Sequence, residues 1–230
     1  MFLDKETRQA TLTRQLDVIP MDALDIQINI IGAGAIGSWV ALSLAKMGFI
    51  DISVWDHDEV SIENMNCQFY PIGMIGKPKV IALQELVSMF TGTTIQIHER
   101  KYEGQELKGL VISALDNMET RESIFKNCRM SASWIIDPRM SLEAASLFVC
   151  DLRNSELVSQ YGKTFYSDAE AVQERCTAKS TIYTANLIAG LVAKTVKDIA
   201  TRSESRIKNA DWHIGNNQLL AWGAEGNRYS

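Results

Sequence analysis

The sequence predicts an α/β fold with a mostly parallel sheet that is flanked by helices and extended by antiparallel strands in its C-terminal half. Two observations lead to this prediction. An apolar strand at 26–31 runs into a glycine-rich turn at 32–38, and a helix follows at 39–47. A second strand at 50–55 then ends in an acidic segment, Asp56-His57-Asp58. This order of strand, glycine turn, helix, strand and acid is typical of Rossmann-like nucleotide-binding domains.

The glycine turn and the acid that follows it have spacings suited to a nucleotide. Gly32 is expected to make the tight turn, Gly34 to let backbone N–H groups approach a phosphate, and Gly37 to let helix and strand pack closely. The helix N-terminus offers free N–H groups and the positive end of its dipole to an anion. Asp56 lies at about the offset of 20 residues that suits an acid on ribose hydroxyls. We therefore predict a nucleotide site here.

The rest of the nucleotide-binding half continues the alternation of strands and helices. The polar segment 59–70 is expected to be an ordered loop or short helix at the carboxyl ends of the strands. A helix at 78–90 begins at a proline and repeats apolar residues on one face, which predicts packing on the sheet. Strands are expected at 94–99 and 110–115, and Asp116 or Asn117 is placed to cap the helix predicted at 119–130.

The C-terminal part of the chain is less regular. We expect strands at 134–136 and 144–152, then an irregular surface segment with one short helix near 167–174. A long apolar helix at 181–200 would cover a face of the sheet. The whole chain, 1–230, is predicted to be one domain. Its parts are a helical arm at 1–25, the nucleotide-binding half at 26–137, a second half at 138–200 and a polar tail at 201–230.

Bulk composition narrows the class of protein. The chain has 230 residues, 46% hydrophobic and 22% charged, as in an ordinary globular protein. Its net charge of −5 argues against nucleic acid as the main ligand. No apolar run approaches the roughly 18 residues of a membrane span. The N-terminus is charged early and lacks the apolar segment of a signal peptide, so we expect a cytoplasmic location.

The cysteines are expected to be thiols in a reducing compartment. They lie far apart in the sequence, at Cys67, Cys128, Cys150 and Cys176, without a C-x-x-C pair. A structural zinc site is therefore not expected. The three histidines share no metal-ligand spacing, so we interpret them as structural or solvated residues.

Four further features follow the glycine turn in a fixed order. They are the acids at Asp56 and Asp58, Asn64 and Gln68 in the next loop, Gly76-Lys77-Pro78-Lys79 at a helix start, and Asp116-Asn117 with Arg121 after a later strand. Over about residues 8–200, this combination resembles the ubiquitin-activating-enzyme-like family, the ThiF/MoeB/HesA group of adenylyltransferases. The glycine turn alone would also fit an NAD-dependent oxidoreductase, but an ordinary dehydrogenase has no reason to carry the other motifs.

The resemblance implies an activity and a set of ligands. Members of this family use ATP and magnesium to adenylate the C-terminal carboxylate of a small ubiquitin-like protein or a peptide. The second half of the chain would then lie on the acceptor side. Asp116 would bind magnesium and Arg121 would brace its loop, while Lys79 would sit against the phosphates. The nucleotide-binding residues implied are Gly32, Gly34, Gly37, Asp56, Asp58, Asn64, Gln68, Lys79 and Asn117.

Two further roles follow only from the resemblance. Arg14 resembles an N-terminal arginine that reaches the triphosphate of the partner subunit, which implies a homodimer. Cys176 stands where some relatives form a thioester with the activated partner, although a structural cysteine is the alternative. Taken singly, Arg14 and Lys79 also fit solvated surface residues, and Asp116 also fits a simple helix cap.

One position departs from the family pattern. The loop of the family usually reads Asn-x-x-Arg-Gln, and here Cys67 takes the place of the arginine. This replacement removes a permanent charge and its bidentate fork. Lys77, Arg139 or a partner's Arg14 would have to compensate. The alternative is a non-catalytic subunit that binds nucleotide and supports an active partner.

Overall fold

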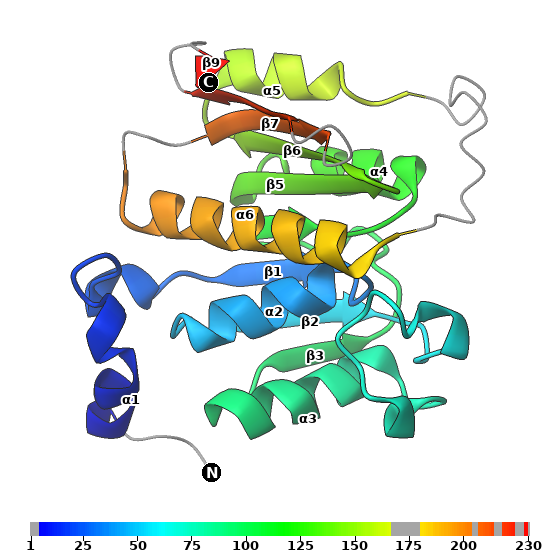
Figure 1. Ribbon diagram of the computed structural model, residues 1–230. Coiled ribbons are helices and arrows are strands. Elements are labelled where there is room, and N and C mark those ends of the chain that lie inside the picture. Colours follow the sequence, from blue (N-terminus) through cyan, green and yellow to red (C-terminus); the bar gives the residue numbers. More distant parts are fainter. Residues whose placement is uncertain (1–4, 167–179, 204–206, 214–217, 224–227, 230) are drawn as a thin grey trace.

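A single mixed sheet forms the centre of the computed structural model, which describes residues 5–166, 180–203, 207–213, 218–223 and 228–229 (Figure 1). The strand order within these residues is β3-β2-β1-β4-β5-β6-β7-β8-β9. Strands β3 to β5 in this order pair in parallel, and every later pair is antiparallel. The predicted fold class is therefore confirmed.

The strands and helices have the following bounds. The strands are β1 (Ile28–Ile31), β2 (Ile52–Asp56), β3 (Gln96–Glu99), β4 (Gly109–Ser113), β5 (Ala132–Ser141), β6 (Ala144–Asp151), β7 (Ile207–His213), β8 (Gln218–Gly223) and β9 (Arg228–Tyr229). The α-helices are α1 (Lys5–Leu12), α2 (Gly37–Lys46), α3 (Lys79–Thr91), α4 (Met118–Cys128), α5 (Ser155–Gly162) and α6 (Ile182–Ala200). Short 3₁₀ helices are η1 (Thr13–Gln15), η2 (Met21–Leu24), η3 (Ile62–Asn64) and η4 (Ile72–Met74).

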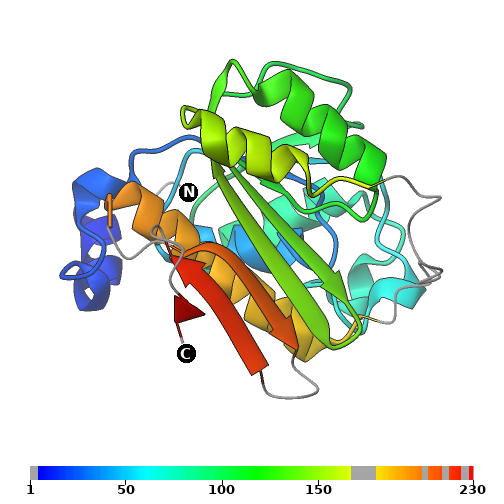
Figure 2. The same cartoon turned by 90° about the horizontal axis from the view of Figure 1, so that it is seen from above.

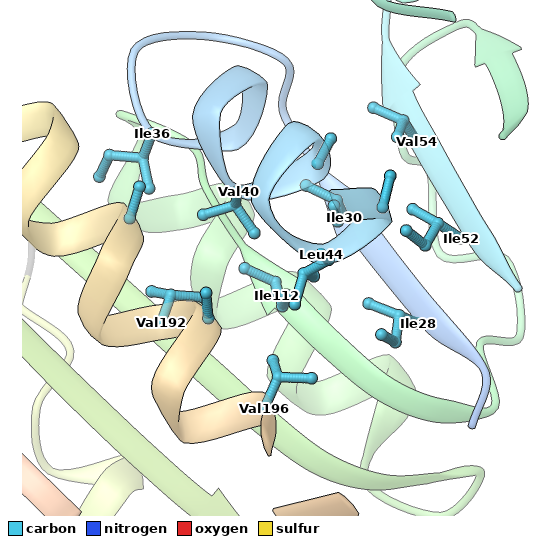
Figure 3. Close-up of a cluster of buried hydrophobic side chains, with 14 of the residues drawn as sticks. Ile28, Ile30, Ile36, Val40, Leu44, Ile52, Val54, Ile112, Val192 and Val196 are labelled. Atoms are coloured by element: carbon cyan, nitrogen blue, oxygen red, sulfur yellow. The ribbon is translucent and has the colours of Figure 1, made fainter. Parts of the chain in front are cut away.

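Helices cover both faces of the parallel part of the sheet. Helices α2, α3 and α6 pack on one face, and α4 and α5 lie on the other (Figures 1 and 2). All four residues of β1 are buried, because a parallel strand with helices on both sides has no solvent face. Figure 3 shows Val192 and Val196 of α6 packed over the same part of the sheet as Val40 and Leu44 of α2. This apolar layer holds the glycine turn above the strand ends.

Two elements in the second half differ from the prediction. Strand β5 runs through 132–141 rather than 134–136, because the charge of Asp137 is paired inside the protein and does not end the strand. Helix α5 occupies 155–162, within a segment predicted to be irregular, and Asn154 caps it by accepting the N–H groups of Glu156 and Leu157. The short helix expected near 167–174 lies outside the described residues.

The region predicted as a polar tail contains strands β7 to β9, which supply most of the antiparallel extension (Figure 1). A strand in an antiparallel sheet can leave alternate side chains in solvent, so a polar composition does not exclude it. Within the described residues, no helix is both long enough and apolar enough to cross a bilayer.

We expect Leu44→Ala to lower the free energy of unfolding by about 2–5 kcal/mol, because Leu44 is fully buried between α2 and the sheet and its loss leaves a cavity. Chemical denaturation monitored by circular dichroism would measure the change. Met130→Ala is the control, since Met130 is 93% exposed and its loss should change stability by less than about 0.5 kcal/mol. Equal stabilities for the two variants would contradict the packing described here.

Candidate functional site

The glycine turn lies at the carboxyl ends of the parallel strands, where open α/β sheets bind ligands. Gly32 has a φ of +101°, and a Cβ there would meet the carbonyl oxygen of Ala114 at 2.4 Å. A Cβ on Gly37 would lie 1.8 Å from the carbonyl oxygen of Gly32. At Gly34 the nearest atom is the side-chain nitrogen of Gln68, at 3.9 Å. Packing therefore requires glycine at 32 and 37, whereas Gly34 leaves space above the turn.

Asp56 joins the end of β2 to this turn. One carboxylate oxygen accepts the N–H of Ala33 at 2.7 Å, and the other accepts the N–H of Asp58 at 2.8 Å. Each carboxylate oxygen has two lone pairs, so the half-buried Asp56 keeps capacity for further hydrogen bonds. The predicted contact with ribose hydroxyls would use this remaining capacity.

Lys79 and Asp58, both predicted site residues, form an ion pair. The Nζ atom of Lys79 lies 2.8 Å from Oδ2 of Asp58, and the lysine is 5% exposed. The N–H of Lys79 also donates to the carbonyl of Asp58 at 2.9 Å, which fixes the start of α3 beside the end of β2. Burial by itself raises the pKa of Asp58, but the hydrogen bond and charge of Lys79, with the charges of His57 and Lys101, hold that pKa below its usual value.

The loop at 61–70 wraps around the N-terminus of α2. Asn64 accepts the backbone N–H of Gln68 through its carbonyl and donates from its side chain to Ser61 at 2.8 Å. The N–H of Phe69 donates to the hydroxyl of Ser38 at 3.1 Å. The Oε1 atom of Gln68 is buried, and no described residue donates a hydrogen bond to it. We refer to residues 61–70, in which Asn64 and Gln68 are predicted to contact nucleotide, as the nucleotide loop.

Tyr70 is a site residue that sequence reasoning missed. Its hydroxyl donates to the carbonyl of Ala33 at 2.7 Å, inside the glycine turn. Burial raises the pKa of Tyr70, and the charge of Asp56 raises it further, so the hydroxyl remains a donor. The turn is thus held by Asp56 on its N–H and by Tyr70 on its carbonyl. An aromatic residue two positions after Gln68, in a polar loop, is the signal that could have indicated this role.

The loop between β4 and α4 presents Asp116 to solvent. The side chain of Asn117 accepts the N–H of Thr120 at 2.8 Å and so caps α4. Arg121 is buried and donates to the carbonyls of Leu115 and Ser113, which confirms that it braces this loop. An exposed carboxylate on a braced loop is a hard oxygen donor of the kind that Mg²⁺ prefers.

A buried charge cluster lies behind the Asp116 loop. Asp137 is fully buried and forms ion pairs with Arg121 and Arg139, and the hydroxyl of Tyr161 donates to it at 3.1 Å. Burial is the main reason that the pKa of Arg121 is lowered to about 10, and the charge of Arg139 is the next. Arg139 also donates to the carbonyl and hydroxyl of Thr164, each at 2.9 Å. The cluster fixes the Asp116 loop against the second half of the chain.

The structure does not bring every predicted residue to the site. Arg14 is exposed on η1, and its neighbour Gln15 donates to the carbonyl of Met47 at the opposite end of α2 from the glycine turn. Cys67, in the position of the family arginine, is 3% exposed. Cys176 lies outside the described residues.

Two of the three cations proposed to compensate for Cys67, Lys77 and Arg139, already have partners within their own chain. Lys77 forms an ion pair with Glu85 at 2.7 Å, and Arg139 is tied to Asp137 and Thr164. The side chains of Asp56, His57 and Asp58 place one ligand atom each within 4.8 Å of one another. Because Asp58 is already paired with Lys79, this group is a poorer candidate for a metal than Asp116.

We expect Gly37→Ala to destabilise the protein by about 3 kcal/mol or more, the upper end of the cost of overpacking, because the added Cβ meets backbone that cannot move away. Gly190→Ala is the matched control. Gly190 is exposed in α6 with no atom near its missing Cβ, so alanine should stabilise the helix by up to about 1 kcal/mol. Urea unfolding would measure both, and a wild-type midpoint for Gly37→Ala would contradict the close approach.

Stability should also depend on His98, which stacks on Trp55 at the end of β3 with ring centroids 3.7 Å apart. Burial, followed by the charge of Arg100, lowers the pKa of His98. The unfolded chain then binds a proton more readily, so this contribution is complete above the unfolded pKa near 6.5 and is lost as pH falls below it. His98→Phe keeps an aromatic ring there, and thermal melts should show it losing less stability than wild type between pH 7.5 and 5.5. Identical pH profiles would contradict this assignment.

Comparison with known proteins gives relatives of several kinds. The chain is 31% identical over 106 residues to the NEDD8-activating enzyme E1 catalytic subunit of Arabidopsis thaliana, covering 43% of this chain and 23% of that protein. It is 30% identical over 111 residues to the tRNA threonylcarbamoyladenosine dehydratase of Haemophilus influenzae, covering 44% of this chain and 42% of that protein. The matched region is thus less than half the length of either relative.

Solved structures share the fold across nearly the whole chain. E. coli MccB in complex with MccA superposes with a TM-score of 0.75 at 12% identity, covering 96% of this chain and 72% of MccB. E. coli MccB with ATP superposes with a TM-score of 0.71 at 13% identity, covering 93% of this chain and 70% of MccB. At these identities the likeness establishes the fold alone.

The ThiF family matches residues 12–220, which include the glycine turn, the nucleotide loop, the Asp116 loop and most of the antiparallel extension. The chain therefore belongs to the ThiF family.

Proposed function

We propose that this chain uses magnesium and ATP to adenylate the C-terminal carboxylate of a small ubiquitin-like protein or a peptide. One observation carries the proposal, a continuous line of contacts from Lys79 to the glycine turn. Lys79 is paired with Asp58, the N–H of Asp58 donates to Asp56, and Asp56 accepts the N–H of Ala33. A buried cation is thus held beside a turn whose Gly34 side is open.

This arrangement suits the chemistry of adenylation. A carboxylate oxygen must bond to the α-phosphorus while the bond from that phosphorus to the bridging oxygen breaks and pyrophosphate leaves with the electron pair. Both reactants are anionic, so the site must neutralise charge and hold the attack in line. Lys79 acts as a point charge against the phosphates, and the N-terminus of α2 offers N–H groups to them. Asp116 would hold magnesium, which neutralises charge on the phosphates.

The roles of the other ligands follow from their positions. Asp56 accepts hydrogen bonds from the ribose hydroxyls, and Asn64 and Gln68 contact ribose or phosphate oxygens. The buried, unpartnered Oε1 of Gln68 supports this role, because a buried acceptor without a donor is costly and a ligand hydroxyl would satisfy it. Asn117 contributes mainly by capping α4 and so orienting Asp116.

The nature of the acceptor is inferred from charge and from the relatives. The relatives include an enzyme that activates a ubiquitin-like protein and one named for a modified tRNA nucleoside. A net charge of −5 disfavours a large polyanion such as tRNA, so we favour a protein or peptide acceptor. The structure of MccB with MccA and that with ATP are consistent with an acceptor of this kind and with this cofactor.

A homodimer is part of the proposal. Arg14 is exposed and lies at the end of α2 that is remote from the turn of its own chain. Cys67 leaves the nucleotide loop without the guanidinium that the family carries there. A second copy could supply the missing positive charge through the partner's Arg14.

A second candidate function is a non-catalytic subunit that binds nucleotide and supports an active partner. The burial of Cys67 favours it, because a buried thiol offers no charge to phosphates. The two functions differ in one measurement. A non-catalytic subunit binds magnesium–ATP but exchanges no pyrophosphate with any acceptor.

Asp116→Asn should reduce ATP–pyrophosphate exchange about a hundredfold or more, because the metal loses its carboxylate and the phosphates lose charge neutralisation. Exchange of labelled pyrophosphate into ATP would be measured with a panel of small proteins and peptides that have free C-terminal carboxylates. Glu119→Gln is the control, since Glu119 is an exposed acid in the first turn of the same helix.

The outcomes separate the candidates. Loss of exchange in Asp116→Asn with wild-type exchange in Glu119→Gln would support adenylation. Undiminished exchange in Asp116→Asn would refute the metal role of Asp116. Wild-type protein that binds magnesium–ATP tightly yet exchanges with no acceptor would favour the non-catalytic subunit.

A further inference from the structure

We infer that Cys67 is a positioning residue that ties the nucleotide loop to the segment leading into α6. Its thiol is buried and takes part in two polar contacts. The hydroxyl of Ser180 donates to Sγ at 3.2 Å, and the thiol in turn donates to the carbonyl of Asn64 at 3.8 Å. The thiol thus connects two segments that lie 113 residues apart in sequence. That the loop it positions holds nucleotide rests on the proposed function.

Neighbouring contacts hold the same junction. The side-chain amide of Asn66 donates to the carbonyl of Ser180 at 3.4 Å. The indole N–H of Trp39, in α2, donates to the carbonyl of Cys67 at 2.9 Å. Residues 66 and 67 are therefore held from α2 on one side and from the start of α6 on the other. The junction does not depend on a single hydrogen bond.

Ser180 is itself fixed to the turn between β5 and β6. It forms a backbone bridge with Leu142, which has a φ of +45°. The hydroxyl of Thr184, in the first turn of α6, donates to the carbonyl of Leu142 at 3.0 Å. A path of contacts thus runs from the nucleotide loop through Ser180 to the second half of the chain. This path crosses the boundary between the two predicted halves.

The geometry gives Cys67 a role that an arginine in its place would not fill. A guanidinium at this buried position would be desolvated without a carboxylate partner among the described contacts of Cys67, which is unfavourable. The thiol fits this position and accepts a hydrogen bond from Ser180. The carbonyl of Asn64 accepts from this thiol and from the backbone N–H groups of Cys67 and Gln68. The contact therefore preorganises Asn64 and Gln68 before any ligand arrives, which lowers the entropy cost of binding.

The test uses Cys67→Ala, Ser180→Ala and the variant that carries both changes. These three are compared with Cys67→Ser, which keeps a small group able to donate and accept. Magnesium–ATP is titrated by calorimetry, and amide hydrogen exchange is followed by mass spectrometry for residues 64–70. Each alanine variant should raise the Kd about two- to tenfold, the equivalent of one hydrogen bond. The double variant should be no weaker than either single one, and Cys67→Ser should recover most of the affinity.

Cys150→Ala is the matched control, because Cys150 is equally buried but lies in β6 within the other core cluster. It should lower the melting temperature as Cys67→Ala does, yet leave the Kd and the exchange of 64–70 unchanged. An equal rise in Kd for Cys150→Ala would reduce the role of Cys67 to general stability and overturn the inference.

The amide exchange arm is independent of nucleotide. Faster exchange of residues 64–70 in Ser180→Ala would support the junction whether or not the protein binds nucleotide. Absence of magnesium–ATP binding by the wild-type protein would refute the proposed function and leave the junction standing. Unchanged exchange in both Ser180→Ala and Cys67→Ala would overturn the inference.

Discussion

The carboxylate of Asp56 accepts one N–H from the glycine turn and one from the segment after β2, and the geometry of the site depends on this bridge. The bridge forms only because Gly32 and Gly37 let the turn approach the neighbouring backbone more closely than any side chain would allow. Once Asp58 is fixed by its N–H, its carboxylate is in place to pair with Lys79. The start of α3 is therefore positioned by a chain of polar contacts that begins at the turn, and apolar packing of α2 and α6 holds that turn over the strands.

Charge on the other side of the site is organised differently. The charged carboxylate of Asp137 is buried in the interior, where its desolvation would be prohibitive without a partner of opposite charge. Arg121 and Arg139 are these partners. The same arginines reach outward to the Asp116 loop and to Thr164. One buried carboxylate thus couples β5 to α4 and to the segment after α5. Strand β5 continues through this charge, and the second half of the chain acquires a fixed position relative to the nucleotide half.

The nucleotide half was predictable because its signals are local. Buried parallel strands are continuous apolar runs, and glycine spacing reflects the turn itself, so β1, α2, β2, α3, β4 and α4 appear within about two residues of their predicted bounds. Strand β5 and strands β7 to β9 were shortened or missed because long-range strand pairing decides them. Helix α5 was missed although Asn154 caps it locally, because its segment is otherwise polar. The same limit applies to the site. The acid at 56 and the lysine at 79 follow from spacing, whereas Tyr70 and Ser180 act through partners 37 and 113 residues away.

The replacement of an arginine by Cys67 therefore separates two properties that one residue would otherwise combine. Order in the nucleotide loop comes from packing and hydrogen bonds, through Trp39 and Ser180, and requires no charge. Stabilisation of the phosphates requires charge, and in the proposed site this charge would come from Lys79, which is already paired with Asp58. Loop order acts on the bound ground state and the transition state alike, so it favours binding. Charge aimed at the phosphates acts most where negative charge develops during the reaction. The substitution should thus preserve affinity for nucleotide and lower the rate of the chemical step. A cation from a second subunit would act on that step, because it would supply the missing charge in the transition state.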